Sequence, residues 1–121
     1  QNRHAFHVCP AETEGFGHYI VEAMSVGATT ITVDAPPMSE LVTELRGILI
    51  PCSGTGRQRL ATTYRVDAAG LASGVERALA WDEGARRVVG RRARAWFEEN
   101  DRAFRARAAD VLREVVRAAR G

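Results

Sequence analysis

The chain has 121 residues, of which 45% are hydrophobic, and its 17 basic and 15 acidic residues give a net charge of +2. This length suits one small domain, which buries roughly two thirds of the surface of its unfolded chain. No apolar run approaches the ~18 residues of a membrane-spanning helix, and nothing at the start resembles a signal peptide. A membrane span within this sequence is therefore excluded. We expect a cytoplasmic location and, without an initiator methionine, a fragment of a longer protein.

The sequence begins with a pattern typical of alternating strands and helices. Residues 5–9 form a short apolar run that ends at Pro10, which predicts a buried strand. From His18 the period changes to that of a helix with one apolar face. Residues 29–33 are β-branched and predict a second strand, followed by a proline-containing loop. These elements place a strand-to-helix turn at the glycines between them.

The next segment continues the same alternation. Pro37 or Met38 is expected to open a short helix through Leu41, Val42 and Leu45, which Gly47 ends. Residues 48–50 form a third apolar run, closed by a proline. Strand, helix, strand, helix, strand with short connections predicts a parallel sheet with right-handed crossovers. The fold class is therefore α/β, a Rossmann-like parallel sheet with flanking helices.

The remaining residues predict a loop and three helices. Residues 52–65 show no clear period and are interpreted as a long surface loop. Asp67 is expected to cap a helix that carries Leu71, Val75 and Leu79 on its apolar face. The two helices expected from Glu83 onward are separated by a break at residues 98–101. Their inward residues are predicted to be Ala85, Val89, Ala93, Trp96 and Phe97 in the first, and Phe104, Ala108, Val111, Leu112 and Val115 in the second.

This pattern divides the chain into two parts. Residues 1–66 are expected to form a partial Rossmann-like core, and residues 67–121 to form helices that pack on the same domain. Cys9 and Cys52 are too few for a disulfide framework or a zinc site, so we expect two buried, reduced thiols. His4 and His7 have no matching partners and are interpreted as structural. No metal site is predicted.

Residues 14–22 carry the clearest functional pattern. Gly15 and Gly17 lie in the turn that leads into the first helix, where glycine lets the backbone approach a ligand closely. The first helical turn offers unpaired N–H groups that suit phosphate oxygens. Glu14 and Glu22 flank this turn and could accept hydrogen bonds from hydroxyl groups. The pattern predicts a site for a polyhydroxylated, phosphorylated ligand, with solvated surface glutamates as the alternative.

An ordered series of motifs extends this pattern along the chain. The motifs are Cys9-Pro10, Glu14-Gly15-Phe16-Gly17, Glu22-Ala23-Met24, Gly27-Ala28, Glu40-Leu41-Val42 and Gly47-Ile48-Leu49-Ile50. Together they resemble the carboxyl-terminal half of glycosyltransferase family 4, retaining enzymes of the two-Rossmann GT-B architecture. The resemblance is dense over residues 5–51 and holds only in outline from residue 67 onward.

The resemblance implies roles for the residues of the first motif. Glu14 would be the catalytic residue that lies against the donor sugar, without having to act as a nucleophile. Glu22 would hold the ribose hydroxyls, while backbone amides of the turn would support the sugar and the diphosphate. The implied donor-binding residues are Gly15, Phe16, Gly17, His18, Tyr19 and Glu22.

Three further residues have two interpretations each. His18 either contacts the sugar or caps the helix, since histidine serves both roles. Asp34 and Glu40 lie in loops at the carboxyl edge of the predicted sheet, where ligands of open parallel sheets bind. They are possible donor contacts, or they stabilise turns and helix starts. Tyr19 and Met24 are expected to be packing residues.

The resemblance also implies a reaction and its partners. A glycosyl unit would pass from a nucleotide-diphosphate sugar to an acceptor with retention, and fixed dipoles would stabilise the departing diphosphate. No metal or other cofactor would be needed. The acceptor would bind an amino-terminal domain that this sequence lacks, so the isolated chain is expected to be inactive. Lipid-linked acceptors would place the full enzyme at the inner face of the membrane.

The arginine distribution supports a hypothesis from another class. Residues 86–121 carry eleven arginines and five acids, whereas residues 1–85 carry six arginines and ten acids. A basic helical module could bind nucleic acid or an anionic membrane surface. The arginines alternate with an apolar stripe, however, which is typical of solvated faces of packed helices. We therefore expect no nucleic-acid partner and keep the basic module as the alternative.

Overall fold

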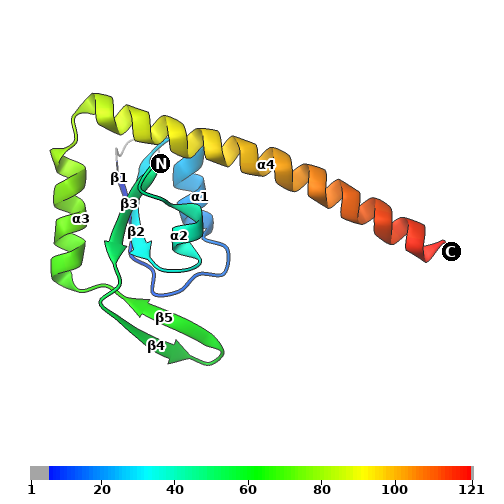
Figure 1. Ribbon diagram of the computed structural model, residues 1–121, viewed down its shortest axis with the longest axis horizontal. Coiled ribbons are helices and arrows are strands. Elements are labelled where there is room, and N and C mark those ends of the chain that lie inside the picture. The colour runs from blue at the N-terminus through cyan, green and yellow to red at the C-terminus, as the bar shows by residue number, and fades with distance from the viewer. Residues whose placement is uncertain (1–5, 121) are drawn as a thin grey trace.

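The computed structural model describes residues 6–120, which form an α/β fold (Figure 1). Its centre is a parallel sheet with the strand order β1-β2-β3. The strands are β1 (Phe6–Cys9), β2 (Thr29–Asp34) and β3 (Gly47–Pro51). The predicted Rossmann-like parallel sheet is confirmed. His4 and Ala5, which the predictions also named, lie outside the described residues.

One face of the sheet is covered by three helices, α1 (His18–Ser25), α2 (Met38–Leu41) and α4 (Glu83–Ala119). Side chains from each helix enter one core cluster. The fully buried or nearly buried members are Cys9, Ile20, Met24, Val33, Ala35, Met38, Val42 and Ala93. This packing fixes the start of α1 at the carboxyl edge of the sheet, because β1 ends where the loop to α1 begins.

The opposite face is covered by α3 (Ala68–Ala80). Alternate strand residues point to the same face, so Ile48 and Ile50 of β3 join Ile31 of β2 and Ala78 of α3 in a second core cluster. Leu71 and Val75 pack on this second cluster as predicted, but Leu79 is 67% exposed. The buried helix residues at this point are Gly74 and Ala78 instead.

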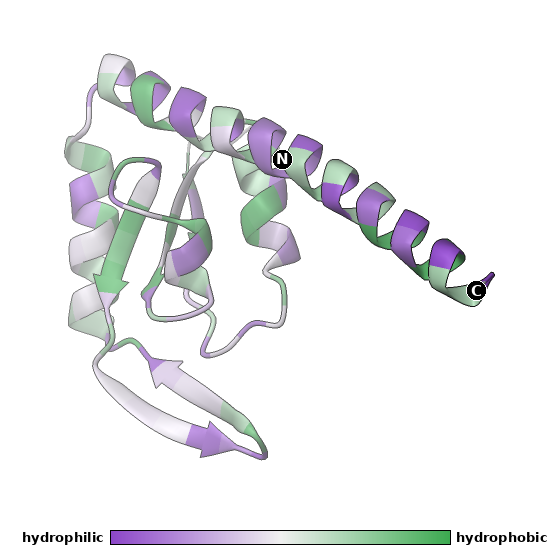
Figure 2. Ribbon diagram, turned by 45° about the vertical axis from the view of Figure 1, so that its right-hand side comes forward, coloured by the Kyte–Doolittle hydropathy of each residue, from purple (hydrophilic) through white to green (hydrophobic). Residues whose placement is uncertain are grey.

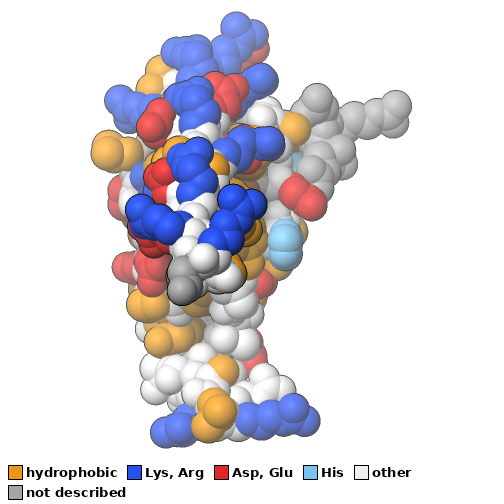
Figure 3. All heavy atoms as spheres, turned by 90° about the vertical axis from the view of Figure 1, so that its right-hand side faces the viewer, with side chains coloured by type: hydrophobic (Ala, Val, Ile, Leu, Met, Phe, Trp, Pro, Cys, Tyr) orange, Lys and Arg blue, Asp and Glu red, His pale blue; other side chains and the backbone are white. Residues whose placement is uncertain are grey.

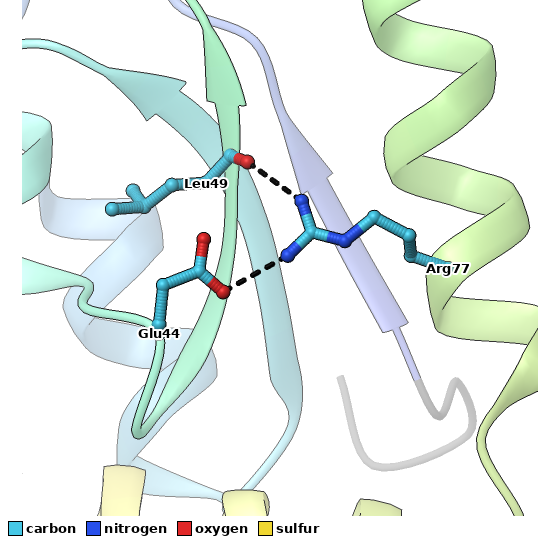
Figure 4. Close-up of polar contacts among 3 residues, drawn as sticks. All are labelled: Glu44, Leu49 and Arg77. Carbon is cyan, nitrogen blue, oxygen red and sulfur yellow. Dashed lines mark hydrogen bonds and ion pairs between the residues drawn. The ribbon is translucent and has the colours of Figure 1, made fainter.

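A polar clamp also joins α3 to the sheet (Figure 4). Arg77 donates one hydrogen bond to the carbonyl of Leu49 at 3.1 Å and another to the carboxylate of Glu44 at 2.9 Å. Both charged side chains are substantially exposed, so the ion pair itself contributes little. The main consequence of the clamp is that the hydrogen bond from Arg77 satisfies the Leu49 carbonyl of the edge strand β3.

The predicted loop at residues 52–65 is wrong, because this segment forms a β-hairpin. The antiparallel strands β4 (Gly54–Gln58) and β5 (Ala61–Arg65) pair with each other and project below the parallel sheet (Figure 1). Among their residues only Thr63 is buried. The hairpin therefore has no buried apolar face to produce the alternation from which strands are recognised.

The predicted break at residues 98–101 is also wrong, because α4 continues through it as one helix. Three ion pairs bridge the polar segment along the helix surface, with distances from 2.6 to 2.9 Å. They are Arg94–Glu98, Arg102–Glu99 and Arg105–Asp101. Pairs three or four residues apart stabilise a helix by about 0.2–0.5 kcal/mol each, so these polar residues favour the helix rather than ending it.

The outer part of α4 extends beyond the sheet. Its apolar side chains were predicted to face inward, but most of them are exposed. Figure 2 shows apolar and polar segments alternating along this projecting part. Val89 and Ala93 of the inner part are buried, but Ala85 is exposed. The outer part carries these exposed side chains: Phe104, Val111, Leu112, Val115 and Val116.

The short helix after β2 also differs from the prediction. It ends at Leu41, because Val42 has an extended backbone with φ −107° and ψ 130°. Leu45 is 65% exposed, and Gly47 begins β3 instead of ending a helix. No helix in the described part of the chain is long and apolar enough to cross a membrane.

Candidate functional site

The two predicted site loops meet at the carboxyl edge of the parallel sheet. The loop after β1 leads to α1, and the loop after β2 leads to α2. Between them is a cavity of about 330 Å³. Its lining residues are Gly15, Phe16, Pro37, Glu40, Leu41, Trp96 and Asn100. The structure thus brings Glu40 beside the glycine turn, whereas the exposed Asp34 does not line this cavity.

Gly17 shapes the turn that starts α1. Its φ is 77° and its ψ is 45°, a left-handed conformation that glycine adopts without steric cost. It is the N-cap residue, and within residues 6–120 no side-chain hydrogen bond caps the start of the helix. His18 therefore does not cap the helix. Its ring instead contacts that of Phe16, with centroids 4.9 Å apart. The first-turn N–H groups are available to a ligand.

Glu14 is held at the base of this turn by Tyr19. The Tyr19 hydroxyl donates a hydrogen bond to the Glu14 carboxylate. Burial and then this hydrogen bond raise the pKa of Tyr19 above its ordinary value, so the phenol stays protonated and remains a donor. Tyr19 was expected only to pack and to offer its backbone, and spacing alone gives no signal for this contact.

The hairpin supplies a second support for this loop. The backbone N–H of Tyr64 in β5 donates to the carbonyl of Glu12 at 2.7 Å, two residues before Glu14. The hairpin is closed at its base by Ser53, whose N–H donates to the carbonyl of Arg65 at 2.8 Å. Sequence reasoning missed this support because the segment was expected to be a loop. The glutamate is therefore positioned from two sides.

Arg46 supports the loop that carries Glu40. Its side chain donates to the carbonyls of Leu41 at 2.7 Å and Glu40 at 3.1 Å, where α2 ends. The guanidinium also lies over the ring of Trp96, 4.7 Å from the centroid. Burial lowers the pKa of Arg46 from its ordinary value. This contact ties the wall of the cavity formed by α2 to the wall formed by α4.

A second cavity, of about 480 Å³, lies between α1 and α4. It is lined by the predicted residues Phe16, His18 and Glu22, together with side chains of α4 that the sequence did not single out. The complete lining is Phe16, His18, Val21, Glu22, Ser25, Phe97, Asn100, Asp101, Phe104 and Arg107. Phe16 and Asn100 line both cavities, so the two are neighbours. Glu14 and Tyr19 line neither.

Cys9 is buried as predicted, but the prediction of a buried Cys52 is wrong, so the two thiols should differ in reactivity. Burial and then the nearby Glu14 raise the pKa of Cys9 from 9.0 to about 11, while Cys52 is half-buried. Iodoacetamide at pH 8 should therefore alkylate Cys52 well before Cys9, because the thiolate is the reacting form. Mass spectrometry of the folded chain measures the order.

The same pKa shift fixes a pH dependence for folding. Between pH 9 and 11 the unfolded chain releases the thiol proton that folded Cys9 retains, so Cys9 lowers stability as the pH rises through this window.

The urea-unfolded chain is the control for the iodoacetamide labelling, and both cysteines should react there at similar rates. Equal rates in the folded chain would contradict the buried position of Cys9.

Half of the ten arginines of α4 are paired within the helix. Five of them form ion pairs with carboxylates three or four residues away. Figure 3 views the molecule with the carboxyl end of α4 toward the reader, and basic and acidic side chains interleave on it. A mixed surface of this kind attracts a polyanion less than the arginine count implies.

Comparison with known proteins agrees with this geometry. The family described as Glycosyl transferases group 1 matches residues 2–96, which include the sheet, both site loops and the inner part of α4. No curated protein matches the chain. Because the match covers most of the chain and ends after both loops that meet at the sheet edge, the chain belongs to the group 1 glycosyl transferases, enzymes that transfer a sugar.

Proposed function

We propose that this chain binds the nucleotide-diphosphate sugar of a retaining glycosyltransferase of family 4. The observation that carries the proposal is the convergence of the glycine turn and the α2 loop on one cavity beside an uncapped helix start. Glu14 stands at one end of the turn and Glu22 one helical turn beyond His18. This arrangement places hydrogen-bond acceptors on both sides of an anion-binding backbone.

The proposed chemistry uses the fixed dipoles of α1. As the bond between the sugar and the diphosphate breaks, negative charge grows on the departing phosphate oxygen. The N–H groups of the first helical turn already point outward, so they stabilise that charge without reorganising. In this proposal the reaction does not require the chain to bind a metal ion.

Glu14 acts on the sugar in this proposal, and Glu22 on the ribose. The hydrogen bond from Tyr19 holds the Glu14 carboxylate beside the turn, where it would accept hydrogen bonds from hydroxyls of the donor sugar. The exposed Glu22 side chain lines the second cavity, where two ribose hydroxyls could donate to it. Glu40 would contact the donor from the α2 side of the cavity. The Asp34 side chain does not line the cavity, so only the loop that follows it would contact the donor.

The acceptor is proposed to bind a second, amino-terminal domain of the enzyme. We therefore expect residues 1–121 alone to bind the donor weakly and to transfer no sugar, because this architecture carries out its chemistry between two domains. A radiolabelled nucleotide sugar incubated with candidate acceptors tests this. Robust transfer by the isolated chain would contradict the proposed division of roles.

Titration calorimetry with a panel of nucleoside diphosphates and nucleotide sugars tests the donor site directly. Glu22→Ala should weaken the binding of the best ligand at least about tenfold, since hydrogen bonds to a charged group are worth about 1.5–3 kcal/mol. Glu76→Ala is the matched control, because Glu76 is exposed on α3, across the sheet from the cavities. An unchanged affinity in Glu22→Ala would make the ribose role wrong.

A further inference from the structure

We propose that Phe104 and Arg107 of α4 complete the nucleotide site, with Phe104 contacting the base and Arg107 the diphosphate. The inference rests on the proposed function, since it assigns residues to the same ligand. Both residues line the cavity of about 480 Å³ beside Glu22. They lie outside the stretch, residues 2–96, that matches the glycosyl transferase family. Their role therefore adds to the donor motif instead of repeating it.

The apolar part of this cavity is aromatic. Phe16, from the loop before α1, and Phe97 and Phe104, from two different helical turns of α4, all line it. Phe104 is 61% exposed and Phe16 57% exposed, so neither is accounted for by packing within the described residues. Aromatic faces stack on nucleobases of any sequence, which makes this wall suited to the base of a nucleotide.

The charged part of the cavity holds one unpaired cation. Asp101 also lines it, but its carboxylate accepts a hydrogen bond from Arg105 at 2.8 Å and is neutralised there. Arg107 forms no ion pair with any residue in the range 6–120. A guanidinium donates several hydrogen bonds in a planar fork that fits phosphate oxygens. Diphosphate is the chemistry that such a group recognises.

The position of Glu22 connects these two parts. It lies on α1 between the first turn, which faces the diphosphate in the proposed function, and Ser25 further along the same face. A nucleotide that spans the cavity would then have its ribose at Glu22 and its two ends at the arginine and the phenylalanine. The cavity volume is within the range of small-molecule sites.

Two variants and three ligands test the inference by calorimetry. Arg107→Ala should weaken UDP, ADP and inorganic pyrophosphate by threefold to tenfold. Phe104→Ala should weaken UDP and ADP to a similar extent and leave pyrophosphate unchanged, because pyrophosphate has no base. Both side chains are exposed, so the variants should keep the circular dichroism and unfolding midpoint of the parent chain.

Matched controls lie on the same helix. Arg113 is paired with Asp110, and Leu112 is 65% exposed, and neither lines this cavity. Arg113→Ala and Leu112→Ala should bind all three ligands like the parent chain. If Glu22→Ala loses affinity while Arg107→Ala and Phe104→Ala keep it, the inference is wrong and the proposed function stands. If the parent chain binds no nucleoside diphosphate, both are wrong.

Discussion

Replacing Gly90 by alanine is expected to lower the free energy of unfolding by about 3 kcal/mol. A Cβ at this position would lie 2.1 Å from the carbonyl oxygen of Gly27, where α4 crosses the chain just after α1. The colliding atom is backbone, so no rotamer change can relieve it. Gly27 has a φ of 69°, which further limits how its carbonyl can turn away. The two helices would have to move apart, and equilibrium urea unfolding measures the loss.

Gly84→Ala on the same helix is the matched control. A Cβ there would meet only the Asp82 carboxylate, at 3.2 Å. Because alanine favours the helix over glycine by up to about 1 kcal/mol, this variant should be as stable as the parent chain or slightly more so. If the two variants unfolded at the same urea concentration, the close approach of α1 and α4 would be wrong. That result would also remove the support for a cavity between these helices.

The parallel sheet could be predicted because its signals are local. The runs that became β1, β2 and β3 are apolar or β-branched and end at prolines or at a loop carboxylate. Short apolar runs with such ends are sufficient to predict the buried strands of a parallel sheet. The site loops followed directly, since the carboxyl ends of parallel strands share one edge. Glu40 and the glycine turn were brought together by topology alone.

The β4–β5 hairpin and the continuous helix α4 could not be predicted, because they depend on contacts that the hydrophobic pattern of the sequence does not show. In the hairpin, small or polar residues such as Thr55 and Thr62 face solvent, and the strands are held mainly by each other. In α4, the polar residues at 98–101 resembled a break, but arginines one turn away pair with them. Backbone pairing between the two strands determines the hairpin, and ion pairs along the helix surface keep α4 continuous.

The support of Glu14 could not be predicted for a similar reason. Spacing places Tyr19 five residues after Glu14, across a turn whose path depends on the left-handed conformation of Gly17. Each cavity has one wall formed by α4, and the lining residues of this wall follow the Glu14–Glu22 motif by more than seventy residues. The motif therefore predicted candidate site residues, and the fold shows which contacts hold them.

Gly17→Ala is expected to weaken nucleotide binding more than tenfold and to lower stability by about 1–2 kcal/mol. Alanine is strained at a φ of 77°, and its Cβ would lie 2.7 Å from the Cδ1 atom of Leu41. Leu41 lines the cavity from the α2 side, so relief of the collision would separate the two site loops. The first-turn N–H groups would then point away from the proposed position of the diphosphate. Calorimetry and urea unfolding measure the two effects.

Gly15→Ala distinguishes this conformational effect from the loss of a glycine as such. A Cβ at Gly15 would meet no atom within 4 Å, and Gly15 has no positive φ. Stability should therefore stay within about 0.5 kcal/mol of the parent chain. Nucleotide binding should fall less than in Gly17→Ala, because the added methyl group occupies cavity space without turning the helix start. Equal losses of affinity in both variants would mean that close backbone approach at Gly15, and not the left-handed turn at Gly17, controls the site.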